Sequence, residues 1–299
     1  MREHLPAFLD RLETQAQTTL PAFVRAELEA FTTCGDFEQG FLLLACGRCG
    51  DRLRVPFSCK GRGVCPSCMG RRMCETAALL VYHRLPAVPY RQWVLSFPGP
   101  LAVRLGYDTE LLGQVCRAFS NRVMQALRKL VKREHGLATS RALHPGVLVV
   151  VQRFRSDLGL FVHLHCVVTD GCFEELSAGP PRFLTTATLT EDHLEQVLAA
   201  VHRDLAATLD TPPSEPDGGV AACVRLANRR QLRLVDQTPR VPKPMTVTAY
   251  GMQVHAATTV DGRDRRRKGR LCRYLLRPPF AQDAVKALPD GQGRGRNGS

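Results

Sequence analysis

The sequence predicts an α+β protein in which a small cysteine-rich module is followed by a larger domain with an antiparallel sheet. Six of the twelve cysteines lie between Cys46 and Cys74, in a stretch with few aliphatic residues that needs a metal to fold. After residue 86, strand-like and helix-like segments are mixed without the regular alternation that builds a parallel sheet. A chain of 299 residues is long enough for one large domain and one small one.

The spacing of apolar residues outlines the elements. Residues 1–33 predict two short amphipathic helices broken at Pro21, and the segment ETAALLVYHRL after Cys74 predicts a helix that ends at Pro86. In the larger domain we expect strands at 90–97, 146–154, 159–170 and 246–260, and helices at 108–135, 190–209 and 264–277. The Pro- and Gly-rich stretch 211–219 is typical of a linker or insertion. The predicted organisation is N-terminal helices at 1–33, a metal-binding domain at 34–85, a larger domain at 86–289 and a low-complexity tail at 290–299.

The charge distribution predicts a polyanionic partner. The formal net charge is +13, and residues 225–299 carry seventeen basic and five acidic residues, whereas residues 1–45 carry three and seven. The sequence shows no signal-peptide core and no run of about 18 apolar residues, so we expect a cytoplasmic protein without a membrane partner. It also shows no Walker-type glycine-rich loop, which predicts that no nucleotide cofactor is used.

Two CxxC motifs predict a structural zinc site. Cys46 and Cys49 form the first motif, and Cys65 and Cys68 form the second after fifteen intervening residues. Cys59 and Cys74 leave alternatives open, because either could replace a motif cysteine or serve a second ion. The other six are expected mostly to pack in the core: Cys34, Cys116, Cys166, Cys172, Cys223 and Cys272. Basic side chains around the motifs are the expected DNA contacts of this module, namely Lys60, Arg62, Arg71 and Arg72.

A His-Leu-His strand motif predicts a second metal site. His163 and His165 point to the same side of a strand with Cα atoms about 7 Å apart, so the two imidazoles can hold one divalent ion. If strands 146–154 and 159–170 form a hairpin centred on residues 157 and 158, Gln152 lies directly opposite His163 and is a candidate third ligand. The motif alone is weak, and a purely structural reading of it is favoured without further support.

The basic helix supplies that support. Arg267, Arg270, Tyr274 and Arg277 follow a helical repeat and are expected to share one face. A phenol with a pKa of about 10 is a poor nucleophile unless nearby cations or a metal assist it. We therefore predict that Tyr274 is the nucleophile and that the three arginines contact DNA. His255, on the preceding strand, is a further candidate neighbour of the site.

Over most of residues 34–289 the sequence resembles the rolling-circle transposases of the HUH endonuclease superfamily, of the insertion-sequence type with an N-terminal zinc-binding domain. The resemblance is carried, in order, by SCKGRGVCPSCMGRRM, RQWVLSFP, VQRF, VHLHCVVTDG, GMQVHAAT and RLCRYLLRPP. It implies a ferredoxin-like nuclease domain in which the histidine pair binds Mg²⁺ or Mn²⁺ and Tyr274 forms a 5′-phosphotyrosine, so that a DNA strand is nicked and transferred. The implied partners are single-stranded or hairpin transposon ends and target DNA.

Two departures from the family pattern narrow this hypothesis. Some relatives carry a second tyrosine one helical turn after the first, but here that position is Pro278, so the chain resembles the branch with a single tyrosine. A mechanism with one tyrosine needs a second subunit, as in a homodimer, or repeated use of the same tyrosine. The chain also ends in GQGRGRNGS, which suggests a truncated copy. The alternatives are a non-catalytic DNA-binding remnant or regulator, and a replication initiator or relaxase with the same chemistry.

Overall fold

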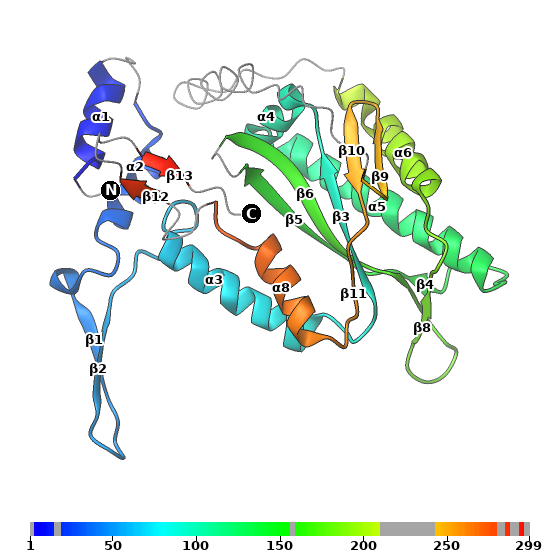
Figure 1. The fold of residues 1–299 in the computed structure, drawn as a ribbon, viewed down its shortest axis with the longest axis horizontal. Coiled ribbons are helices and arrows are strands. Elements are labelled where there is room, and N and C mark those ends of the chain that lie inside the picture. Colours follow the sequence, from blue (N-terminus) through cyan, green and yellow to red (C-terminus); the bar gives the residue numbers. More distant parts are fainter. Residues whose placement is uncertain are drawn as a thin grey trace. The chain divides into compact units, whose positions relative to one another are not determined.

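A computed structural model of the chain describes residues 3–14, 19–155, 159–209, 243–279, 285–287 and 293–295 (Figure 1). Its helices are α1 (Leu5–Thr14), α2 (Ala22–Thr32), η1 (Phe37–Gln39), α3 (Pro66–Leu79), η2 (Leu80–Arg84), α4 (Gly99–Tyr107), α5 (Thr109–Glu134), α6 (Glu191–Leu209) and α8 (Arg265–Leu275). Its strands are β1 (Phe41–Ala45), β2 (Arg52–Pro56), β3 (Tyr90–Ser96), β4 (Leu143–His144), β5 (Val147–Phe154), β6 (Leu160–Thr169), β7 (Gly171–Glu174), β8 (Arg182–Thr185), β9 (Thr246–Ala249), β10 (Met252–His255), β11 (Thr259–Val260), β12 (Val285–Ala287) and β13 (Gly293–Gly295). The chain divides into two compact units: of the described residues, those up to Thr76 and those from Arg277 onward belong to the first, and those between Ala77 and Leu276 belong to the second.

The first unit has almost no apolar core. Among its described residues only Leu5 and Cys65 are buried, although α1, α2 and the hairpin β1–β2 are all formed. The two helices separated at Pro21 agree with the sequence prediction. A unit this small and this poor in buried apolar surface needs another source of stability, such as a bound metal.

The second unit is built on an antiparallel sheet with the strand order β5-β6-β3-β10-β9, and β11 pairs with the start of β3. This confirms the predicted α+β class. The long helix α5 begins after Asp108, whose carboxylate accepts a hydrogen bond from the Leu111 amide at 2.9 Å and caps the helix N-terminus. Strands β3, β5 and β6 and helices α5 and α6 lie where the apolar spacing predicted them.

Side chains alternate between two faces of this sheet, and each face has its own core. Trp93 and Leu164 belong to the larger core, where the apolar stripe of α5 packs; the rings of Trp93 and Phe119 meet edge to face at 6.3 Å. Tyr90 and Val167 point to the opposite face and pack with α8. The α8 residues in that second core are Leu271 and Leu275. The sheet therefore has one mainly apolar face and one face on which α8 packs.

Two predicted elements differ in the structure. The stretch 246–260 is not one strand but three, because Tyr250 and Gly251 adopt positive φ angles of 55° and 72° and turn the chain between β9 and β10. The basic helix ends at Leu275 rather than at residue 277, with Leu276 as its C-terminal cap ahead of two prolines. Residues 156–158 of the predicted hairpin turn and the predicted linker 211–219 lie outside the described residues.

None of the helices in the described parts of the chain combines the length and the apolar character that crossing a membrane requires.

Candidate active site and metal centre

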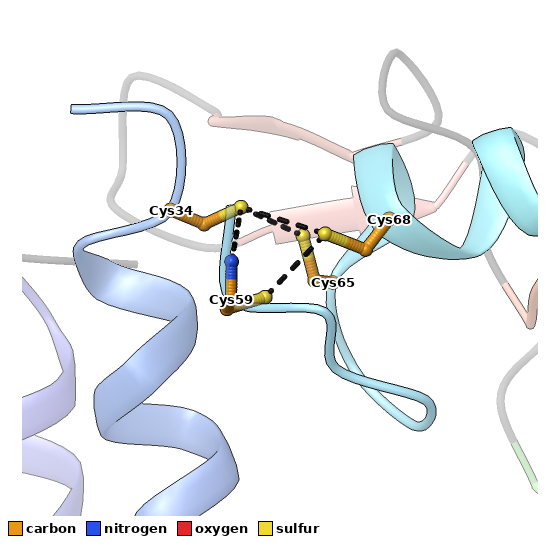
Figure 2. Close-up of side chains that lie close together, drawn as sticks. All are labelled: Cys34, Cys59, Cys65 and Cys68. Atoms are coloured by element: carbon orange, nitrogen blue, oxygen red, sulfur yellow. Dashed lines mark hydrogen bonds between the residues drawn. The ribbon is translucent and has the colours of Figure 1, made fainter. Parts of the chain in front are cut away.

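Four cysteines of the first unit lie together, with their sulfur atoms within 4.8 Å of one another (Figure 2). Cys34 follows α2, Cys59 follows β2, and Cys65 and Cys68 lie at the start of α3. The Sγ–Sγ distances are 3.7 Å for Cys34–Cys68, 3.6 Å for Cys59–Cys68 and 3.6 Å for Cys34–Cys65. A tetrahedron with zinc–sulfur bonds of about 2.3 Å has edges of about 3.8 Å, so these four thiols fit a zinc ion.

Backbone hydrogen bonds hold the loops of this cluster in place. The amide of Gly61 donates to the Cys59 sulfur at 3.3 Å, and the amide of Cys59 donates to the Cys34 sulfur at 3.4 Å. The Glu27 carboxylate on α2 accepts hydrogen bonds from the amides of Gly63 and Val64 at 2.5 and 3.3 Å. Helix α2 therefore anchors the loop that leads to the last two cysteines.

The pKa values of three of the clustered thiols are shifted, and not all in the same direction. Burial raises the pKa of Cys59 and of Cys65. Burial also acts to raise the pKa of Cys68, but hydrogen bonds from the other three thiols outweigh it, and the net pKa of Cys68 is lowered. A metal that binds this cluster displaces the protons of the thiols that become its ligands.

This cluster corrects the predicted zinc ligands. Cys65 and Cys68 belong to it, and so does the alternative Cys59, but Cys46 and Cys49 lie exposed between β1 and β2. Two five-residue strands carry that first CxxC motif about 15 Å along the hairpin, away from the strand ends where the cluster forms.

Cys34 and Cys59 replace the two cysteines of the first motif as ligands, and Cys34 had been expected from the sequence to pack in the core. Cys74 is exposed on α3 and outside the cluster. Of the remaining predicted core cysteines, Cys166, Cys172 and Cys272 are buried, Cys116 is partly buried, and Cys223 lies outside the described residues.

On the α8 side of the sheet in the second unit, the predicted pairing of the histidine hairpin is confirmed. Gln152 lies directly opposite His163, and a β-bulge follows between Gln152 and Phe154. The ring centroids of His163 and His165 are 4.9 Å apart. His163 Nδ1 lies 2.9 Å from the Phe161 carbonyl oxygen, so in the neutral ring this nitrogen carries the proton and Nε2 carries the lone pair that a metal requires.

Gln92 on β3 is a site residue that the sequence analysis missed. Its side-chain amide lies 2.9 Å from His165 Nδ1, and the residue is 8% exposed. If the amide oxygen faces the ring, it accepts the Nδ1 proton and leaves the Nε2 lone pair of His165 for a metal; the oxygen and nitrogen of an amide are interchangeable by a simple flip. The signal in the sequence was a polar residue within an otherwise apolar strand, YRQWVLS.

Tyr274 lies beside the histidine pair. Its ring centroid is 5.7 Å from that of His165, the planes are nearly perpendicular at 86°, and the side chain is 44% exposed. The Gln152 amide nitrogen donates to the backbone carbonyls of Tyr274 at 3.2 Å and Leu275 at 2.9 Å. Carbonyls in the last turn of a helix lack partners within it, so Gln152 caps α8 and ties its end to the histidine hairpin.

The predicted basic residues are all exposed, on two different units. Lys60, Arg62, Arg71 and Arg72 belong to the first unit. Arg267 and Arg270 lie on α8 with Tyr274, whereas Arg277 lies beyond the end of the helix and does not share its face.

His255 lies on the same face as the histidine pair, two strands away, because it pairs with Val94, which pairs with His165. His255 Nδ1 lies 2.7 Å from the Thr246 hydroxyl. Burial, with a smaller contribution from Lys243, lowers the pKa of His255 and favours its neutral form.

Comparison with known families gives two matches that together span most of the chain. Residues 1–97 match the transposase zinc-binding domain of the IS91 type, and residues 146–294 match the family described as "Putative transposase". The first match contains the four clustered cysteines, and the second contains Gln152, the histidine pair and Tyr274. No match is found among curated proteins or among solved structures.

Replacing one clustered cysteine should remove the zinc of the first unit. We expect Cys34→Ser to lower the zinc content of purified protein by about one ion per chain and to loosen the unit, because four thiolates are needed to close a structural site. Cys46→Ser should retain at least about one ion per chain, since its thiol is outside the cluster. The measurement is the number of zinc ions per chain in each variant, determined by plasma mass spectrometry. Loss of the clustered ion in Cys46→Ser but not in Cys34→Ser would contradict the structure.

Removing the Gln152 side chain should free the end of α8. Gln152→Ala loses two hydrogen bonds, each contributing about 0.5–1.5 kcal/mol, so the amides around residues 274–276 should exchange hydrogen about tenfold faster. Gln253→Ala is the matched control, because Gln253 lies on the same face and bonds only to the Thr248 hydroxyl among the contacts described. Unchanged exchange in Gln152→Ala would show that α8 is held in place without it.

Proposed function

Because this chain belongs to the IS91-type transposases, we propose that its second unit is an HUH-type nuclease domain with a ferredoxin-like sheet that nicks and transfers DNA strands through Tyr274. The observation that carries the proposal is the meeting of the Tyr274 and His165 rings, 5.7 Å apart, at a point where Gln152 joins the two elements. The zinc-binding domain would recognise transposon ends through its exposed basic side chains.

The donor atoms suit a divalent cation. Nε2 of His163 and of His165 and the amide oxygen of Gln152 would hold Mg²⁺ or Mn²⁺, which supplies Lewis acidity toward the scissile phosphate when bound. The amide nitrogen of Gln152 is committed to α8, so only its oxygen is available to a metal. The same side chain thus positions the nucleophile and contributes to the metal site.

The tyrosine performs the covalent step. The Tyr274 hydroxyl oxygen attacks phosphorus and loses its proton; the new O–P bond forms as the bond to the 3′ oxygen breaks, and that oxygen takes a proton to become a 3′-hydroxyl. The product is a 5′-phosphotyrosine, and attack by another 3′-hydroxyl reverses the step and joins a new strand. No nucleotide hydrolysis is required, because the phosphotyrosine conserves the energy of the phosphodiester.

The exposed face of α8 would bind the DNA strand. Arg267 and Arg270 precede Tyr274 by seven and four residues and share its side of the helix. They would hold the phosphates on either side of the scissile bond. With one tyrosine on α8, complete transposition would use either Tyr274 of a second subunit or the same Tyr274 twice.

The covalent adduct is the direct test. Wild-type protein incubated with labelled single-stranded DNA and Mn²⁺ should give a band of protein linked to DNA, and Tyr274→Phe should abolish it, a loss of at least about a thousandfold. Tyr250→Phe is the matched control, since Tyr250 is also exposed but lies in the β9–β10 turn. A wild-type protein that binds DNA without forming the adduct would leave only a DNA-binding role.

Gln92 should act through His165. We expect Gln92→Leu to raise the Mn²⁺ concentration needed for half-maximal adduct formation about 10–100-fold, because the ring is no longer held in the tautomer that binds metal. Gln92→Glu should restore the wild-type Mn²⁺ dependence, since a carboxylate also accepts the Nδ1 proton. A variant that loses adduct equally at all Mn²⁺ concentrations would indicate a general structural defect instead.

A further inference from the structure

The first CxxC motif, left out of the cysteine cluster, forms the tip of the hairpin β1–β2, and we propose that it binds a second zinc ion together with the same motif of a second copy of this chain. Each copy would contribute Cys46 and Cys49, so that four thiolates surround one ion shared by a dimer. This proposal does not depend on the nuclease chemistry.

The motif already has the backbone of a metal-binding turn. Gly50 has a φ of 76° and donates to the Cys46 carbonyl at 2.9 Å, and the Cys46 amide donates to the Asp51 carbonyl at 2.8 Å. The thiols of Cys46 and Cys49 are also within hydrogen-bonding reach of each other. The hairpin thus presents two adjacent sulfur ligands in one turn.

The described part of the chain offers this pair no complete site. Among the described residues, the one group of three or more side chains that could hold a metal is the cluster of Cys34, Cys59, Cys65 and Cys68. That cluster already has the four ligands that zinc requires. The carboxylate of Asp51 accepts a hydrogen bond from Cys49 at 3.2 Å, but it does not form a group of three with the two cysteines. Structural zinc takes four ligands, so two more must come from elsewhere.

The hairpin also carries an unpaired apolar face that suits a second copy. Cross-strand pairing puts Leu44 opposite Leu53 and Leu42 opposite Val55, and the three leucines are 52–61% exposed. A lone two-stranded hairpin is marginally stable in water, and a contiguous exposed apolar surface marks an interaction site. In Figure 1 the hairpin projects from the rest of its own unit.

The chemistry of the two faces favours a copy of this chain over DNA at the apolar one. Arg52 and Arg54 point to the opposite face, where the Arg54 guanidinium lies 5.6 Å from the centre of the Phe41 ring. Phosphates would be bound on that basic face. If two apolar faces pack around a twofold axis along the hairpins, their tips meet and the two pairs of thiolates come together.

The test combines zinc content with mass in solution. Wild-type full-length protein should hold about 1.5 zinc ions per chain and run as a dimer in light scattering, one ion per cluster and half of the shared ion. Cys46→Ser/Cys49→Ser should hold about 1.0 ion per chain and run as a monomer. Leu44→Ser/Leu53→Ser should weaken the dimer while the cluster zinc remains. Cys74→Ser is the matched control, an exposed cysteine outside both sites, and should resemble wild type.

Several results would overturn the proposal. A wild-type protein with about 1.0 ion per chain has no second site, and a monomer with about 2.0 ions completes that site within one chain, for example with Asp51. A dimer that persists at the wild-type mass in the double cysteine variant is held by another surface. A dimer that forms only with DNA and survives the double variant would show that DNA, and not the hairpin motif, joins the two copies.

Discussion

Two hydrogen bonds from the Gln152 side chain to the last carbonyls of α8 connect the helix that carries Tyr274 to the hairpin that carries the histidine pair. The apolar packing of Leu271 and Leu275 also holds α8 against the sheet. Apolar contacts are non-directional and fix a helix position loosely, whereas an amide that spans a helix terminus fixes both its end and its rotation. The position of Tyr274 beside His165 depends on that constraint.

The two units solve the problem of stability in different ways. The second buries apolar side chains on both faces of its sheet, whereas the described part of the first buries only Leu5 and Cys65 and gathers four thiols instead. A metal supplies directed bonds that do not require a thick core, so the first unit can keep most of its surface available. Many basic and apolar side chains of this unit are exposed because metal–ligand bonds take the place of a large apolar core.

The sequence predicted those features that depend on residues close together in the chain, and it predicted less well those that depend on contacts between distant segments. The pairing of Gln152 with His163 followed from the period of a strand and the centre of one turn, and it is confirmed because both are short-range properties. The zinc ligands were predicted less well, since Cys34 lies 25 residues from Cys59 in sequence and no motif joins them. Gln92 was missed because its role arises only when β3 pairs with β6. The turn at Tyr250 and Gly251 was missed because only one of its two positive-φ residues is a glycine.

The β-bulge between Gln152 and Phe154 affects how this site can vary. In a regular hairpin, one residue gained or lost near the turn would slip the pairing and send both histidines to the apolar face. A bulge absorbs such a change locally, and here it lies between the turn and the Gln152–His163 pair, next to a bond from the Arg155 amide to the Gly159 carbonyl. A change in length beyond the bulge can therefore leave the pairing of Gln152 with His163 unchanged.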